Sequence, residues 1–245
     1  MECTTHTADV EELKPTRKDA QESDATYQQE LLKVSKNAGL GGGTIVLGIL
    51  LNYAGTVLAT RVIGADAWGV FFLAQTILVN MVLFATLGLN QGALRYVALY
   101  QGRNDLARLK GTVLYCLKRV LVPGVVMTLL IFALAPAIAD GVFKQPELNF
   151  ALRMLILALP FWTATEVMTA SLQGLRLIGP STMVRYGVQP GLRLVLLALL
   201  FAVGLRLAGV VLATVLSMTL ATGYAYWKLR QVSRGFWPET EPVFE

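Results

Sequence analysis

The sequence is poor in the residues that usually build a catalytic centre. Its only histidine, His6, lies near the N-terminus, and its two cysteines are Cys3 and Cys116. A serine–histidine dyad or a histidine metal site in the apolar part of the chain is therefore excluded, and two cysteines are too few for a disulfide framework. No Walker sequence, G-x-x-x-x-G-K-[ST], is present, and no apolar stretch contains a pair of carboxylates. We therefore predict no catalytic residues, no cofactor and no metal site, and transport or a scaffolding role is favoured over enzymatic chemistry.

Charge is also scarce. Only 15% of the 245 residues are charged, whereas soluble domains have about 25%. Four stretches lack any charge, namely residues 37–60, 67–94, 120–139 and 207–227, which contain 24, 28, 20 and 21 residues. Because about 20 helical residues cross a bilayer, each stretch is long enough to span a membrane. This composition excludes an ordinary soluble enzyme and predicts an all-α, polytopic membrane protein.

Two further spans contain a charge. Residues 148–173 are apolar except for Arg153 and Glu166, and residues 182–203 include Arg185 and Arg193. A Gly-Pro pair at positions 179–180 marks a sharp turn between these two blocks. We therefore predict six transmembrane helices, at approximately residues 38–60, 68–93, 119–139, 150–173, 182–203 and 208–229.

The distribution of lysine and arginine predicts the orientation. With six spans and the N-terminus inside, 17 of the 21 basic residues lie on the cytoplasmic side, as the positive-inside rule requires. Both termini are then cytoplasmic. The first 24 residues contain seven acids and only three bases. We accordingly predict a disordered cytoplasmic tail at residues 1–30, a six-helix lobe at residues 31–232 and a C-terminal cytoplasmic tail at residues 233–245.

Ionisable residues inside predicted spans are candidate functional residues because inserting a charge at mid-helix costs about 2.5–3.5 kcal/mol. Glu166 follows Pro160, which is expected to kink its helix. Its carboxylate either pairs with an arginine of a neighbouring span or lines a cavity and binds a cation, a proton or a sugar hydroxyl. The estimated depths of Glu166 and Arg193 differ by about 6 Å, so we expect these two side chains to meet.

Other polar residues extend the candidate set. Arg185, Gln189 and Arg193 recur every fourth residue and form a predicted polar stripe, whose guanidinium groups suit a phosphate; the alternative is that the arginines only satisfy topology. Less specific candidates are Asn52, Tyr53, Gln75 and Asn80, of which the two asparagines could instead bond across a helix pair. In the last span, small residues recur every fourth position and predict close helix packing, mostly within the lobe; they are Gly209, Ala213, Ser217, Ala221 and Ala225.

Several turns carry a family resemblance. The chain contains Gly88-Leu89-Asn90, Arg95-Tyr96-Val97 and Tyr100-Gln101-Gly102-Arg103-Asn104-Asp105. It also contains Ala170-Ser171-Leu172-Gln173-Gly174-Leu175-Arg176 and Gly64-Ala65-Asp66-Ala67-Trp68-Gly69. Across about residues 34–232 these motifs resemble the oligosaccharide and O-antigen flippases of the MATE-like multidrug/oligosaccharidyl-lipid/polysaccharide superfamily.

The resemblance implies one six-helix lobe of a flippase in the bacterial inner membrane. Such a protein moves an undecaprenyl-pyrophosphate-linked oligosaccharide across the membrane for cell-surface polysaccharide biosynthesis, including O-antigen and lipopolysaccharide, and does not bind nucleic acid. Arg95 joins the predicted substrate cavity. Because family members have 12 to 14 spans, a second lobe, a second copy or a partner is expected to complete the transporter. The alternatives are one lobe of a MATE-type drug or metabolite antiporter and a truncated fragment that does not transport.

Overall fold

The computed structural model describes residues 17–236, with side chains from residue 41 to residue 232. It divides into two compact units, residues 1–39 and residues 40–245. Helix α1 begins at Arg17, so residues 17–30 of the predicted disordered tail are helical. Residues 1–16 of that tail lie outside the described residues, as do residues 237–245 of the predicted C-terminal tail.

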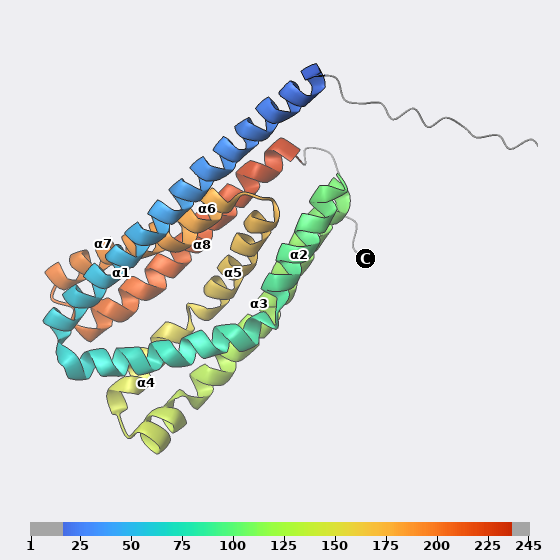
Figure 1. Ribbon diagram of the computed structural model, residues 1–245. Helices are drawn as coiled ribbons and strands as arrows, with labels where there is room; N and C mark the ends of the chain where they lie inside the picture. Colours follow the sequence, from blue (N-terminus) through green and yellow to red (C-terminus); the bar gives the residue numbers. More distant parts are fainter. Residues whose placement is uncertain (1–16, 237–245) are drawn as a thin grey trace, which may run out of the picture. The chain divides into compact units, whose positions relative to one another are not determined.

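Within the described range the chain is all-helical, with short turns between the elements (Figure 1). The α-helices are α1 (Arg17–Thr86), α2 (Leu89–Gly102), α3 (Leu106–Pro136), α4 (Pro146–Ile156), α5 (Leu159–Gly174), α6 (Ile178–Thr182), α7 (Gln189–Ala202) and α8 (Leu207–Phe236). Two π-helices, η1 (Ala137–Phe143) and η2 (Met183–Val188), precede the chain's entry into α4 and α7. The predicted all-α class is confirmed.

The structure confirms the apolar helices but not the predicted number of membrane spans. Among the described residues, four segments are long enough and apolar enough to cross a bilayer: Gly41–Thr86, Leu106–Phe143, Ile178–Ala202 and Leu207–Val232. A fifth is obtained if α4 and α5, which meet at a 44° bend, count as one span. The predicted six spans are therefore not confirmed, and reaching six would require the two parts of the 46-residue Gly41–Thr86 segment to cross separately.

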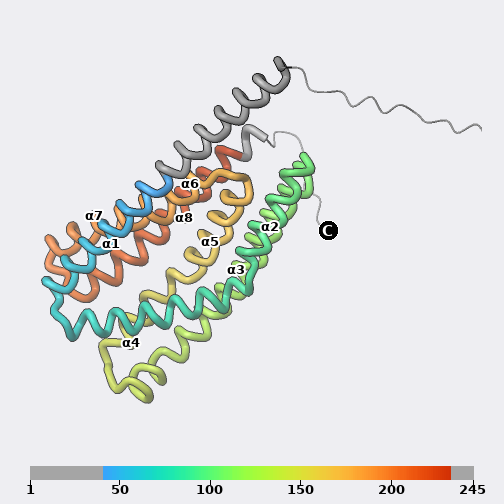
Figure 2. The backbone as a smooth tube through the Cα atoms, viewed as in Figure 1, coloured from blue at the N-terminus to red at the C-terminus, as the bar shows by residue number. Residues whose placement is uncertain are grey.

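Gly64 divides that long segment. Its φ and ψ angles of 84° and 170° are non-helical and separate two helical parts of α1. A positive φ of this kind is accessible to glycine because glycine has no Cβ atom. Figure 2 follows the chain through this bend and then through a second change of direction between α1 and α2. The bend lies where the sequence predicts the connection between the first two spans.

Further breaks lie where α1 meets α2 and where α4 meets α5. Leu87 and Gly88 both have positive φ, at 46° and 73°, so the chain turns as it enters α2. The α4–α5 bend of 44° lies at residues 157–158, directly before Pro160 in the first turn of α5. Proline is tolerated in a first helical turn but not in a helix interior, so Pro160 marks a helix start. The predicted kink at this proline is confirmed.

The small residues of α8 are packed inside the lobe. All five of them, from Gly209 to Ala225, are buried, and α8 contacts α4, α5 and α7. A Cβ atom added to Gly209 would lie 3.2 Å from the Cβ atom of Leu205 and 3.5 Å from that of Leu200. Small side chains allow this close approach of helices, where van der Waals contact replaces the hydrophobic effect in lipid. The predicted packing within the lobe is confirmed.

Buried hydroxyl groups in α5 and α8 bond mainly to their own helices. Thr169 donates to the carbonyl of Thr165 at 2.8 Å, and Thr214 donates to that of Val210 at 2.8 Å. Hydrogen bonds between the two helices involve Thr222, whose hydroxyl lies 2.8 Å from that of Thr165 and 3.0 Å from the carbonyl oxygen of Phe161. A hydrogen bond to a carbonyl of the same helix satisfies hydroxyls such as those of Thr169 and Thr214 without a partner on another helix.

Candidate functional site

Glu166 occupies a polar position on an otherwise apolar helix. It lies near the middle of α5, whose other residues from Thr163 to Leu172 are all buried. The side chain of Glu166 is 21% exposed, and its Oε1 atom accepts a hydrogen bond of 3.3 Å from Nε1 of Trp162, one turn earlier on the same helix. The carboxylate is thus held by α5 itself and directed away from the apolar core.

The second oxygen of Glu166 bonds to Arg185. Nη2 of Arg185 donates to Oε2 of Glu166, which joins η2 to α5. The side chain of Arg185 is 40% exposed, so the pair lies at the edge of the packed interior. Of the two readings that the sequence left open for Glu166, pairing with an arginine of a neighbouring segment is observed. The partner is Arg185. The expected contact between Glu166 and Arg193 is not observed.

Arg185 lies in the π-helix η2, which changes the residues that share a face with it. The hydrogen bonds of a π-helix run from residue i to i+5, so a π-turn contains an extra residue relative to an α-helix. Side chains at i and i+4 consequently no longer share one face. Arg185 meets Glu166 on α5, whereas Gln189 donates to the sulfur of Met218 on α8 at 3.3 Å. The polar stripe that α-helical spacing predicts is therefore distributed over different neighbours.

A close approach between α1 and η2 lies beside the same pair. At Gly48 of α1 an added Cβ atom would clash with the backbone carbonyl and the Cβ atom of Tyr186, the residue that follows Arg185. Only glycine allows the two backbones to come this near. Gly48 therefore contributes to holding the π-helix, and the arginine within it, in place.

Arg193 has a different environment. It lies on α7, and its guanidinium carbon is 5.5 Å from the centre of the Phe71 ring on α1, a cation–π distance. One turn beyond Phe71, the Oε1 atom of Gln75 is buried and has no hydrogen-bond partner in the described part of the chain. Arg193 and Gln75 therefore belong to the interior between α1 and α7 and not to the Glu166 pocket.

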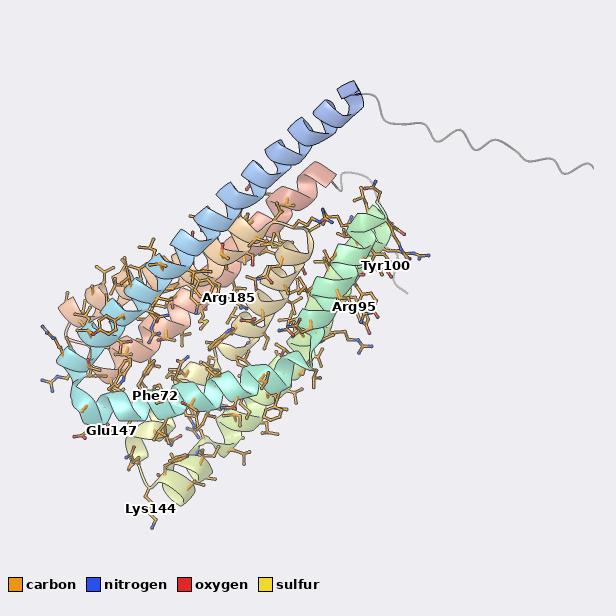
Figure 3. The ribbon with its side chains drawn as sticks, viewed as in Figure 1. Phe72, Arg95, Tyr100, Lys144, Glu147 and Arg185 are labelled. Atoms are coloured by element: carbon orange, nitrogen blue, oxygen red, sulfur yellow. The ribbon has the colours of Figure 1, made fainter. Side chains whose placement is uncertain are left out.

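A small polar pocket surrounds the Glu166–Arg185 pair. It has a volume of about 100 Å³ and is lined by residues of α2, α5 and η2. Besides the charged pair, the lining consists of Asn90, Gln91, Leu94, Ala170 and Gln173. Gln173 donates from Nε2 to the hydroxyl of Ser181 at 2.9 Å, which leaves its carbonyl oxygen available as an acceptor. Figure 3 labels Arg185, and also Arg95 on the neighbouring helix α2.

Three amide side chains line this pocket without being among the candidates that the sequence predicts. Asn90, Gln91 and Gln173 lie at the ends of helices, where polar residues are ordinary. A signal was nevertheless present, because Asn90 and Gln173 each belong to one of the motifs that carry the family resemblance. These motifs come from α2 and α5, which pack directly against each other.

The remaining candidates lie apart from the pocket. Asn52, Tyr53 and Asn80 on α1 are exposed, as is Arg95 on α2. Asn80 donates to the carbonyl of Thr76 on its own helix at 2.8 Å, so the suggested bond between Asn52 and Asn80 is not observed. Of the nine predicted cavity residues, the structure thus brings together only Glu166 and Arg185.

Comparison with solved structures identifies the fold. A multidrug resistance MATE family transporter of the MOP superfamily, in an outward-facing conformation, is 20% identical with a TM-score of 0.65; the match covers 83% of this chain and 48% of that one. A MOP superfamily transporter from Pyrococcus furiosus is 20% identical with a TM-score of 0.66, covering 87% and 46%. A MATE protein in a straight conformation is 16% identical with a TM-score of 0.70, covering 91% and 48%.

The chain spans about half the length of the solved transporters that it matches. No curated protein sequence matches it. The family model described as "Polysaccharide biosynthesis protein" matches residues 34–240, which is most of the chain. The protein therefore has the fold of half a MOP superfamily transporter, and it belongs to the polysaccharide biosynthesis protein family.

Proposed function

We propose that this chain forms one half of a flippase for undecaprenyl-pyrophosphate-linked oligosaccharides in the bacterial inner membrane, with both termini in the cytoplasm. The observation that carries the proposal is Arg185, whose guanidinium group lies in a polar pocket within a membrane-type helical fold. A second lobe, supplied by a second copy, a partner or further sequence of a longer protein, completes the substrate path. The product would supply cell-surface polysaccharide such as O-antigen.

The chemistry of the pocket suits a phosphate group followed by sugars. Arginine presents donors in a planar fork that matches phosphate oxygens, and a phosphate can replace the Glu166 carboxylate as its partner. The amides of Asn90, Gln91 and Gln173 offer both donors and acceptors to sugar hydroxyls. A volume of about 100 Å³ holds only a small polar group, so the rest of the substrate would lie against the second lobe.

A cation antiporter is the first alternative. That function requires a carboxylate free to bind a cation, and therefore Glu166 without a neighbouring arginine. In this structure Arg185 is bonded to Glu166 and neutralises its charge. The arrangement favours an anionic substrate over a cationic one.

Complementation tests the proposal. A flippase-deficient strain would receive this chain together with a candidate second lobe, and surface polysaccharide would be measured. We expect Arg185→Gln to abolish complementation and Arg61→Gln to retain it, because Arg61 is an exposed arginine outside the pocket. Normal polysaccharide with Arg185→Gln would exclude the proposed role of the pocket. Failure of the unaltered chain with every second lobe would favour a fragment that does not transport.

An efflux assay separates the two transporter classes. Cells expressing the same lobe pairs would be tested for extrusion of a fluorescent cationic dye. We expect no extrusion above the empty-vector control. Dye efflux that is lost in Glu166→Gln but retained in Arg185→Gln would replace the flippase proposal with the antiporter.

A further inference from the structure

A second and larger cavity lies away from the Glu166 pocket. Its volume is about 690 Å³, within the range of small-molecule sites. It is formed by the start of the second part of α1 and by the connection from η1 into α4, and its lining includes Asp66, Val70, Phe72, Leu73, Lys144 and Glu147. Figure 3 labels Phe72, Lys144 and Glu147. Both contributing segments adjoin breaks in the helices, at Gly64 of α1 and at the connection from η1 into α4.

The cavity contains charges of both signs. Asp66, Lys144 and Glu147 are all exposed, and none has an ion-pair or hydrogen-bond partner within the described part of the chain. Two carboxylates and one ammonium group give a net charge of −1. An anionic ligand is disfavoured by this balance, and a purely cationic one would meet the ammonium group of Lys144. A ligand that carries an ammonium group next to a phosphate complements all three side chains.

One side of the cavity is apolar. Val70, Phe72 and Leu73 of α1 line it, and Phe72 is 59% exposed although it is a large aromatic residue, whereas Val70 is only 7% exposed. In a membrane protein such a surface contacts acyl chains. The charged groups and the apolar wall together match a molecule with a zwitterionic headgroup and a hydrocarbon tail, and not a free zwitterion in water.

From these observations we propose that the cavity is a binding site for a phosphatidylethanolamine-type lipid. The carboxylates of Asp66 and Glu147 accept hydrogen bonds from its primary ammonium group, and the ammonium group of Lys144 binds its phosphate. The acyl chains lie along Phe72 and the neighbouring apolar residues of α1. This inference is independent of the proposed transport function, because the cavity shares no residue with the Glu166 pocket.

Lipid retention measured by native mass spectrometry tests the site. The purified chain would be exposed to an equimolar mixture of phosphatidylethanolamine, phosphatidylcholine and phosphatidylglycerol of identical acyl chains. Because phosphatidylcholine has no N–H donor for the two carboxylates, we expect phosphatidylethanolamine to be retained about tenfold over phosphatidylcholine. Equal retention of the two lipids, or preferential retention of phosphatidylglycerol, would overturn the proposal.

Variants locate the effect in the cavity. The double variant Asp66→Asn/Glu147→Gln should lose the preference for phosphatidylethanolamine, whereas Asp140→Asn, an exposed acid of η1 that does not line the cavity, should keep it. Lys144→Gln should lower retention of phosphatidylethanolamine and phosphatidylcholine alike. An unchanged preference in the double variant would place the lipid elsewhere. Competition by soluble O-phosphoethanolamine at lipid concentrations would show that the headgroup alone suffices and would remove the role of the apolar wall.

Discussion

The two cavities differ in how their charges are satisfied. In the small pocket, Glu166 and Arg185 neutralise each other, and packed helices α2 and α5 form the walls. In the large cavity, Asp66, Lys144 and Glu147 have no partners in the described part of the chain, and the walls are helix ends. The internal pair must be displaced before the small pocket can bind a ligand, whereas the large cavity is ready to bind one. The small pocket therefore suits a regulated event, and the large cavity suits constant occupancy.

Helix α8 packs against α4, beside the large cavity, and against α5, beside the small pocket, so enlarging its small residues should have the largest effect. Leucine at both Ala213 and Ala221, which are 0% and 1% exposed, would force α8 away from its neighbours. Since overpacking costs about 1–3 kcal/mol per site, we expect a loss of about 2–6 kcal/mol. The melting temperature in detergent would show it. An unchanged melting curve would contradict the packing of this face.

Gly174 provides a more local test of the wall between α2 and α5. An added Cβ atom would lie 2.9 Å from the carbonyl oxygen of Leu94 and 2.9 Å from the Cβ atom of Val97. Gly174→Ala should therefore destabilise the lobe by about 1–3 kcal/mol. Gly92→Ala is the matched control, because nothing lies within 4 Å of a Cβ atom at that position of α2. Equal melting temperatures for the two variants would refute the close contact.

A double-mutant cycle measures the pairing in the small pocket. The single variants Glu166→Gln and Arg185→Gln each leave one charge without its partner, and the double variant removes both charges. Because the side chains are 21% and 40% exposed, water screens the pair, and we expect a coupling energy of about 1 kcal/mol. Thermal unfolding of the four proteins gives this value. Strict additivity would mean that the pair contributes nothing to folding.

The smallest effect is expected at Asn80. Its side chain is exposed and bonds only to a carbonyl of its own helix, so Asn80→Ala should change stability by less than about 0.5 kcal/mol. A large drop in melting temperature would show that the residue has a partner inside the lobe. If surface polysaccharide falls while the melting curve is unchanged, Asn80 faces the substrate path and the second lobe.

Helix positions followed from the sequence more readily than the site did. The charge-free stretches predict the helices, and Gly64 and Pro160 predict the bends. Both predictions depend on local properties: apolar side chains for the helices, and the backbone preferences of glycine and proline for the bends. The partner of Glu166 could not be obtained in this way, because it depends on the π-helix η2. A single π-turn changes which residues share a face. The sequence of residues 183–188, MVRYGV, contains no pattern that predicts a π-helix. Depth estimates that assume regular α-helix place Arg185 and Arg193 at about equal distances from Glu166, about 6 Å each, so they could not choose between the two arginines.

Polar residues within apolar helices also proved ambiguous by themselves. Glu166 and Asn80 both interrupt apolar runs, and the sequence does not show whether either has a partner on another helix. In the structure Glu166 faces Arg185 of another segment, whereas Asn80 bonds to a carbonyl of its own helix. This difference depends on how segments distant in the sequence pack together. The family motifs carried this information for Asn90 and Gln173, because both flank the contact between α2 and α5.

The hydroxyl groups between α5 and α8 have a mechanical consequence. Because residues such as Thr169 and Thr214 bond within their own helices, displacing one helix along the other leaves these hydrogen bonds intact. Among the side chains that the structure describes, the bonds that would have to be exchanged are those of Thr222 to Thr165 and to the Phe161 carbonyl. The hydrogen bonds of Thr222 therefore link α5, which carries Glu166, to one position along α8.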